Sequence, residues 1–291
     1  VGMLGGFTPV MIKFGVREFP PLLLTTLRFL VASIVFYPFF FRYQRNLARH
    51  DIWFLFTRSL FFAGNVGFFS VAIQYTTTIV SQLLYTLVPV IVLLMSRFLF
   101  KETMTMQKIA GLIIASFGVG LILKESIVKT EILAFGTPLG NLLTLIAVFS
   151  WAFYVLVSKD LTKKYSPVVT SFSSFVTTVV VLLFLLPFEG SVRSFQIYDV
   201  TTTGILSIFG LGIFSSALMF FLIQFVIKKT SPFTASLHQY IGPFSSGVIS
   251  VPILGEKPTP ILFVSGLCII FGVLLATAYE HLRKQFKSVL Q

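Results

Sequence analysis

The chain has 291 residues, of which 56% are hydrophobic and 11% are charged, against roughly 25% charged residues in an average soluble domain. Its mean hydropathy of +0.94 excludes a soluble domain held by one membrane anchor, because apolar surface on that scale needs lipid as its solvent. The net charge of +12 does not indicate a nucleic-acid partner, since the basic residues occur in short clusters between apolar runs, as in membrane proteins.

Apolar runs follow one another along the whole chain and leave no room for a soluble domain. A membrane-spanning helix needs about 20 mostly apolar residues. By this measure the sequence predicts ten spans, near 1–16, 21–41, 52–74, 77–99, 106–124, 138–158, 167–187, 202–227, 232–254 and 259–279. The predicted fold is therefore an all-α integral membrane protein of ten transmembrane helices. Because the apolar pattern has already begun at Val1, we expect the first helix to be truncated at its start.

Basic residues between the predicted spans are divided unequally between the two sides of the membrane. The side shared by both termini has 14 of them and the other side has 6. Cytoplasmic loops have the excess of Lys and Arg in membrane proteins. We therefore predict a multi-pass protein of the cell membrane (plasma or inner membrane), with both termini in the cytoplasm and the lipid bilayer as a partner.

The second half of the chain repeats residues of the first half at fixed spacings. Two ordered sets of residues recur. The first set, Phe7, Lys13, Pro21 and Phe29, recurs as Phe153, Lys159, Pro167 and Phe175. The second set, Thr76, Leu83, Pro89 and Glu102, recurs as Thr230, Leu237, Pro243 and Glu256. Five helices is an odd number, so the second half must enter the membrane upside down, which is the inverted-repeat plan of many transporters. We take residues 1–130 as the first five-helix repeat and residues 131–291 as the second.

Catalytic and metal-binding motifs are missing from the sequence. No Gly-rich phosphate loop ends in Lys-Ser or Lys-Thr, and no span contains His-Glu-x-x-His, so neither ATP hydrolysis nor zinc chemistry is indicated. The single cysteine, Cys268, lies in an apolar run and provides neither a disulfide framework nor a thiol metal site. We predict that the protein is not an enzyme and uses no cofactor and no metal.

Two prolines occupy equivalent places in the two halves. Pro89 and Pro243 each lie 11 or 12 residues into a predicted span, and proline removes one helical hydrogen bond and clashes with the carbonyl four residues earlier. In lipid a freed carbonyl is costly unless it faces protein or a wet cavity. One interpretation is a structural kink, and the other, which their symmetry favours, is that both residues are hinges beside a central cavity.

Polar residues accompany these prolines on the same helices. Gln82, Tyr85 and Pro89 have i, i+3, i+7 spacing, which places them on one helix face. Each polar group alone is more typical of hydrogen bonding between helices. Together, however, the polar and aromatic residues of several spans could line a binding site. The predicted substrate-binding residues are Gln82, Tyr85, Gln239, His238, Asn65, Trp151, Tyr154 and Arg28.

Charge inside the predicted spans is one-sided. Arg28 lies well within the second span, whereas no Asp or Glu lies deep in any span. Intramembrane arginines are functional candidates because their insertion is costly. The absence of a deep carboxylate weakly favours neutral, zwitterionic or anionic cargo over cationic cargo.

Small residues cluster in the fifth and tenth spans. Gly111 and Ala115 have small-xxx-small spacing, which permits close packing of helices. We expect this packing within the protomer or at the contact of a homodimer.

Several of these segments resemble the signature of the drug/metabolite transporter superfamily, EamA type. They are 84–89 (LYTLVP), 100–102 (FKE) and 109–111 (IAG) in the first half, and 239–243 (QYIGP) and 254–256 (LGE) in the second. Leu27-Arg28-Phe29 is also similar to the second helix of the family, which gives Arg28 a structural alternative. The resemblance implies two EamA repeats and a central cavity that opens alternately to the two sides.

The resemblance and the residues together predict a secondary transporter, an exporter or an exchanger. The expected cargo is a small polar metabolite, most simply one like an amino acid. An exchanger of sugar phosphates, nucleotide sugars or nucleoside derivatives is the alternative within transport, and it needs more basic residues in the cavity than the sequence offers. A membrane receptor or assembly subunit that kept the fold without transport is the alternative outside it.

The charge bias makes the topology testable. We expect that cysteines introduced as Asn46→Cys and Thr130→Cys react with an impermeant thiol reagent from opposite sides of the membrane. Cys268→Ala provides the background without a native thiol. Labelling of both positions from one side would refute the inverted repeat.

Overall fold

A computed structural model describes residues 1–43, 47–100, 106–128, 132–192, 194–196 and 200–289. These residues form helices and connecting segments without any strand. The helices are α1 Gly2–Gly15, α2 Pro21–Tyr43, α3 Arg49–Ala72, α4 Thr78–Tyr85, α5 Val88–Phe100, α6 Met106–Val128, α7 Ile132–Phe135, α8 Pro138–Lys164, α9 Pro167–Leu185, η1 Leu186–Phe188, η2 Gly190–Val192, α10 Thr202–Gly210, the π-helix η4 Leu211–Leu218, α11 Met219–Lys229, α12 Pro232–Ser236, η5 Leu237–Tyr240, α13 Gly242–Leu254 and α14 Pro260–Val289.

Seven helical segments of the described chain are long and apolar enough to cross a membrane. They are Pro21–Tyr43, Arg49–Ala72, Thr78–Met95, Ile109–Val128, Pro138–Lys164, Pro167–Phe188 and Thr202–Lys229. The other three predicted spans are also helical, but α1 has 14 residues and α13 has 13, and the apolar part of α14 is Pro260–Leu275. The all-helical membrane fold is therefore confirmed, while the count of ten spans stays a prediction.

Ser-Pro and Thr-Pro dipeptides begin three helices of the second half. The hydroxyls of Thr137, Ser166 and Ser231 accept hydrogen bonds from backbone N–H groups of the first turns of α8, α9 and α12. Such a residue is a favourable N-cap, and the proline after it lacks an N–H that would be unpaired in any case. The sequence therefore fixes these helix starts locally.

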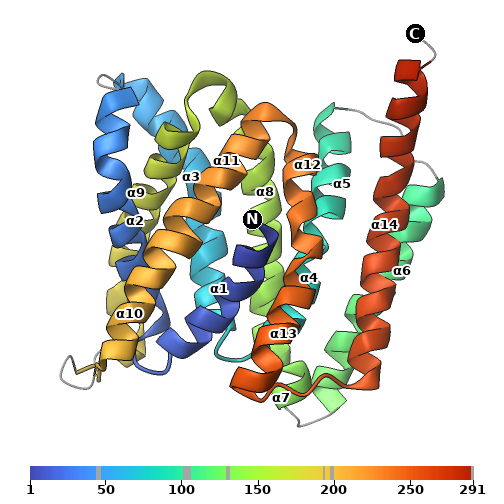
Figure 1. Cartoon of the computed structure of the whole chain (residues 1–291), viewed down its shortest axis with the longest axis horizontal. Helices are drawn as coiled ribbons and strands as arrows, with labels where there is room; N and C mark the ends of the chain where they lie inside the picture. Colours follow the sequence, from blue (N-terminus) through green and yellow to red (C-terminus); the bar gives the residue numbers. More distant parts are fainter. Residues whose placement is uncertain (44–46, 101–105, 129–131, 193, 197–199, 290–291) are drawn as a thin grey trace.

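The helices pack side by side as one bundle (Figure 1). Helices α6 and α14 pack together at one edge of the bundle, and α2 and α9 pack together toward the other edge. A Cβ atom on Gly272 of α14 would lie 2.5 Å from the backbone of Gly111 and Ala115 of α6. The small-residue cluster of the sequence therefore serves packing within the protomer.

Phenylalanine rings fill the centre of the bundle between α2, α3, α9 and α11. Phe29 contacts Phe175, its counterpart in the repeat, with ring centroids 5.7 Å apart. Phe62 meets Phe220 edge to face at 4.7 Å. These side chains are buried, so part of the high phenylalanine content serves the core, and the rest includes exposed side chains on the outside of the bundle.

Both predicted kinks coincide with interruptions of the helices. Helix α4 ends at Tyr85 and α5 begins at Val88, so Pro89 is the second residue of α5. In the second half η5 ends at Tyr240, and Pro243 is the second residue of α13. Proline suits the first turn of a helix because its missing N–H would have no intrahelical partner there. A role of the two prolines as hinges stays a prediction.

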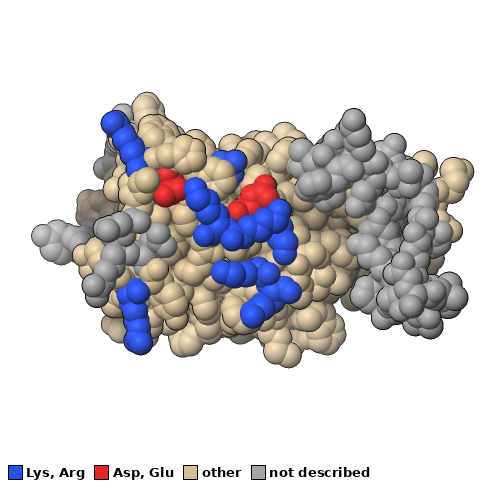
Figure 2. Space-filling view, turned by 90° about the horizontal axis from the view of Figure 1, so that it is seen from above, with Lys and Arg blue, Asp and Glu red and all other residues tan. Residues whose placement is uncertain are grey.

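Charged side chains gather at the end of the bundle where α8 and α11 end, as Figure 2 shows. There Lys164 contacts Asp51 with 2.5 Å between the charged atoms, and the Tyr165 hydroxyl donates to the same carboxylate at 2.6 Å. This is the side with the predicted excess of basic residues. Glu102 of the repeat and the loop positions 46 and 130 lie outside the described residues.

The tight contact of α6 with α14 predicts the effect of one added methyl group. We expect Gly272→Ala to lower the free energy of unfolding by about 1–3 kcal/mol, because its Cβ has no space. Gly120→Ala in α6 is the control, since a Cβ there meets nothing within 4 Å. Thermal unfolding in detergent measures both, and equal melting temperatures would contradict the packing described.

Candidate functional site

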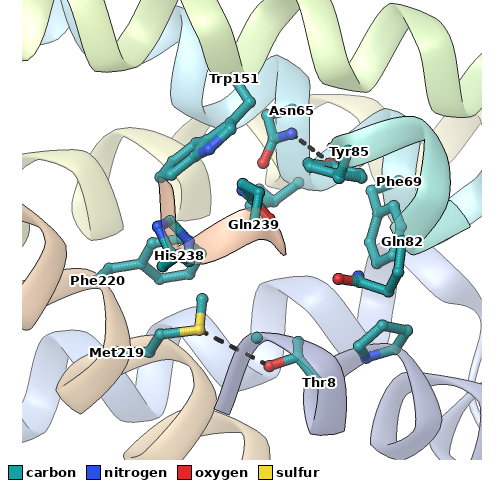
Figure 3. A pocket seen from close by; sticks show the side chains of 13 residues that line it. Thr8, Asn65, Phe69, Gln82, Tyr85, Trp151, Met219, Phe220, His238 and Gln239 are labelled. Atoms are coloured by element: carbon teal, nitrogen blue, oxygen red, sulfur yellow. Dashed lines mark hydrogen bonds between the residues drawn. The ribbon is translucent and has the colours of Figure 1, made fainter. Parts of the chain in front are cut away.

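A cavity of about 60 Å³ lies where α1, α3, α4, α8, α11 and η5 meet (Figure 3). The lining residues are Gly5, Thr8, Pro9, Asn65, Val66, Phe69, Gln82, Tyr85, Trp151, Met219, Phe220, His238 and Gln239.

Six of the eight predicted substrate-binding residues line this one cavity, namely Asn65, Gln82, Tyr85, Trp151, His238 and Gln239. They come from four different elements, and Figure 3 shows their side chains converging on the same space. The interruption after Tyr85 and the 3₁₀-helix η5 both border the cavity. The irregular backbone is therefore buried in protein, as it must be at membrane depth.

Asn65 and Tyr85 are fixed by hydrogen bonds to each other and to the backbone. The Asn65 amide Nδ2 donates to the Tyr85 hydroxyl at 2.6 Å and to the carbonyl of Ala147 at 2.8 Å. The Tyr85 ring also packs edge to face on Phe69 at 5.4 Å. Both donor hydrogens of the Asn65 amide are thus used, so this pair forms a rigid wall of the cavity.

Other polar groups at the cavity have unused hydrogen-bonding capacity. The Gln82 Oε1 acceptor and the Trp151 Nε1 donor are buried and have no hydrogen-bond partner within the part of the chain that the structure describes. Among the described residues, no hydrogen bond to the Gln239 carboxamide is found, although Gln239 is only 7% exposed. Leaving a buried donor or acceptor unpaired costs ~1–3 kcal/mol. Groups of this kind are satisfied when a ligand brings complementary atoms.

His238 is the one titratable imidazole at the cavity. Its Nδ1 lies 2.5 Å from the carbonyl of Ala235, and a carbonyl can only accept, so Nδ1 has the proton in this contact. The other ring nitrogen is then an acceptor in the neutral form. None of the lining residues is Lys, Arg, Asp or Glu, so the polar part of the lining consists of amide, hydroxyl, indole and imidazole groups.

Two predicted site residues do not line the cavity. Tyr154 is buried one helical turn beyond Trp151, where its hydroxyl lies 2.7 Å from Ser174 Oγ and accepts from Gln224 Nε2 at 2.7 Å. Arg28 is buried in α2 with its guanidinium 4.7 Å from the centre of the Phe29 ring. Its Nε and Nη1 have no hydrogen-bond partner in the described chain. Contact of either residue with cargo stays a prediction.

Sequence reasoning missed most of the apolar wall. Phe69 lies four residues after Asn65, hence on the same face of α3, and this spacing would have identified it. Thr8 and Pro9 interrupt the first apolar run, a weaker signal of the same kind. Met219 and Phe220 lie inside a long apolar run of the sequence, and only the packing of α11 brings them to the cavity.

Comparison with known proteins identifies relatives along nearly the whole chain. The model of the EamA-like transporter family matches residues 1–124 and 138–278. The uncharacterized transporter YetK of Bacillus subtilis is 29% identical, over 92% of this chain and 82% of the relative. An uncharacterized transporter of Archaeoglobus fulgidus is 27% identical, over 94% of this chain and 93% of its own length.

Two further comparisons concern the membrane and the fold. The uncharacterized inner membrane transporter YedA of Escherichia coli K12 is 23% identical, over 96% of this chain and 89% of the relative. A crystal structure of another protein has a TM-score of 0.64 at 19% identity, covering 95% of this chain and 96% of that one, which shows a common fold. Family and relatives are named as transporters and not as enzymes. The chain is a multi-pass membrane transporter that belongs to the EamA-like transporter family.

Proposed function

We propose that the protein is a secondary transporter, an exporter or exchanger, that moves a small polar metabolite like an amino acid by alternating access around the central cavity. The observation that favours this most is the set of unpaired polar groups at the cavity, above all Gln82 Oε1 and Trp151 Nε1. Unpaired buried groups occur elsewhere in the described chain as well, such as Arg28 Nε, but at the cavity they come from separate helices and face one space. A cargo with both hydrogen-bond donors and acceptors would satisfy them.

The proposal includes ten spans arranged as two inverted five-helix repeats. Equivalent residues of the two halves make the same contact: Lys13 Nζ donates to the carbonyl of Thr76 at 3.0 Å, and Lys159 Nζ to that of Thr230 at 2.7 Å. Helix pairs correspond as well. Helix α1 packs on α13 as α8 packs on α5, and α2 packs on η4 as α3 packs on α9. This correspondence supports a pseudo-twofold relation of the halves.

The chemistry of the cavity favours an amino-acid-like cargo over a phosphorylated one. Phosphate groups are usually bound by Arg or Lys, and neither residue type lines the cavity. The two carboxamides and the indole N–H suit a neutral or zwitterionic molecule, and the Phe69, Phe220 and Met219 side chains suit its apolar part. The unpaired polar side chains at the cavity argue against a receptor that has lost transport, because a cavity filled only by apolar side chains would need no such groups.

Orientation in the membrane follows from the same charge distribution. We place the end with Lys163, Lys164, Lys228 and Lys229, the ends of α8 and α11, on the cytoplasmic side, in agreement with the positive-inside rule. Both chain termini would then face the cytoplasm.

The first test is transport by the purified protein in liposomes. Exchange of a radiolabelled pool of L-amino acids should exceed that of nucleoside and sugar-phosphate pools, and a transported compound should raise the melting temperature, because a ligand of the folded state alone stabilises it. Exchange of the sugar-phosphate pool instead would overturn the cargo class, and exchange of no pool with no thermal shift would contradict the transport proposal.

Gln239→Ala tests the cavity as the cargo site. It removes a carboxamide without a protein partner, so folding should persist while cargo binding weakens by about 0.5–1.5 kcal/mol per lost hydrogen bond. Gln224→Ala is the matched control, because the Gln224 amide donates to Tyr154 and Ser158 away from the cavity. We expect Gln224→Ala to lower the melting temperature and to leave the cargo affinity nearly unchanged. The reverse pattern would locate the site elsewhere.

A further inference from the structure

One contact joins the cavity wall to the other half of the chain. Gln82, on α4 of the first half, lies against Gly242, the first residue of α13 in the second half. A Cβ atom on Gly242 would lie 2.2 Å from Gln82 Oε1 and 3.3 Å from Cδ, and its three nearest atoms all belong to the Gln82 side chain. No real Cβ tolerates 2.2 Å, so the position of this carboxamide requires glycine at 242.

The equivalent positions in the other pair of helices have the side-chain sizes exchanged. At the repeat spacing of the second set, Gln82 corresponds to Ser236 and Gly242 corresponds to Val88. Helices α12 and α5 pack on each other as α4 and α13 do, and both Ser236 and Val88 are buried. By the repeat, the counterparts of this long polar side chain and glycine are thus a short polar side chain and a valine.

We propose that Gly242 is a positioning residue for the cavity, because it admits the carboxamide of Gln82 between α4 and α13 and so holds the Oε1 acceptor in the cavity wall. Gly242 is not among the residues that line the cavity, so its effect on cargo runs through Gln82. The effect on cargo rests on the proposed function. The effect on the position of Gln82 does not, because it can be measured without cargo.

The exchange of sizes gives the two halves different roles. A carboxamide reaches the cavity from the first half at position 82, whereas Ser236 turns its hydroxyl to the carbonyl of Phe233 at 2.7 Å. Position 82 therefore supplies a carboxamide that its repeat counterpart does not, and the carboxamide from the second half comes from a different position, Gln239. Because the slot of the Gln82 carboxamide is formed by the opposite half, a relative movement of the halves would release the carboxamide from it. Cargo recognition would thereby depend on how the halves are placed.

A double-mutant cycle between Gly242→Ala and Gln82→Ala tests the contact without cargo. The chain has two tryptophans, so Trp53→Phe leaves Trp151 in the cavity wall as the sole reporter. In this background we expect Gly242→Ala to change both the emission maximum and the acrylamide quenching of Trp151, because the flexible end of the Gln82 side chain must swing away. Both effects should vanish when Gln82 is already alanine, since neighbouring residues that share one contact are non-additive.

Gly247→Ala on the same helix is the matched control, because the nearest atom to its Cβ would be Ile79 Cδ1 at an ordinary 3.9 Å. We expect it to leave Trp151 quenching unchanged. Effects of Gly242→Ala that persist unchanged beside Gln82→Ala, or no effect at all, would overturn the proposal.

Exchange of the L-amino acid pool in liposomes adds the functional measurement. Gly242→Ala should raise KM by roughly three- to tenfold, the loss of one hydrogen bond, and the double variant should be no worse than Gln82→Ala. An unchanged KM with an intact Trp151 cycle would refute the role in cargo binding. If the wild type exchanges no pool, the transport proposal fails, while the Trp151 cycle still decides whether Gly242 positions Gln82.

Discussion

Every polar group of the backbone must find a partner inside the protein where lipid surrounds it, and the rest of the structure depends on this constraint. Helices meet this constraint for apolar runs of about 20 residues, because their backbone hydrogen bonds close within one segment. Each interruption of a helix then leaves backbone groups that need other partners. The break after α4 is buried at Thr86, whereas Ile241, between η5 and α13, is exposed on one side. The cavity borders both of them, so the site lies where the helical hydrogen bonding is incomplete.

The side chains around the cavity divide into two groups by their hydrogen bonding. Asn65 and Tyr85 use their polar atoms on each other and on the backbone, which makes that wall rigid. Gln82 Oε1 and Trp151 Nε1 have no hydrogen-bond partner in the described chain, so under the proposed function they are the atoms that cargo would satisfy. Such a site needs no charged side chains in its lining to recognise a polar molecule. The dipoles of the carboxamide and indole groups suffice for recognition.

The candidate site could be predicted in large part because the two prolines pointed to it. Pro89 and Pro243 indicated where the helices are interrupted, and the spacing of Gln82 and Tyr85 from Pro89 placed those side chains on the same face. Tyr154 is close to Trp151 in the sequence, but it lies one helical turn further along α8. Its hydroxyl therefore contacts a different set of neighbours, Ser174 and Gln224. Arg28 is a predicted site residue because of its charge within a span, but charge alone does not show which way a side chain points.

The sequence by itself determined the all-helical membrane fold, the starts of α8, α9 and α12 at Ser-Pro and Thr-Pro, and the interruptions at Pro89 and Pro243, because these follow from the residues of one segment. Only the tertiary structure decided which helices meet. Met219 and Phe220 line the cavity, Gly272 lets α6 pack closely on α14, and Gly242 leaves space for Gln82. Each of these contacts depends on the approach of segments far apart in the chain. Hydropathy and spacing describe one helix at a time and contain no information on its neighbours.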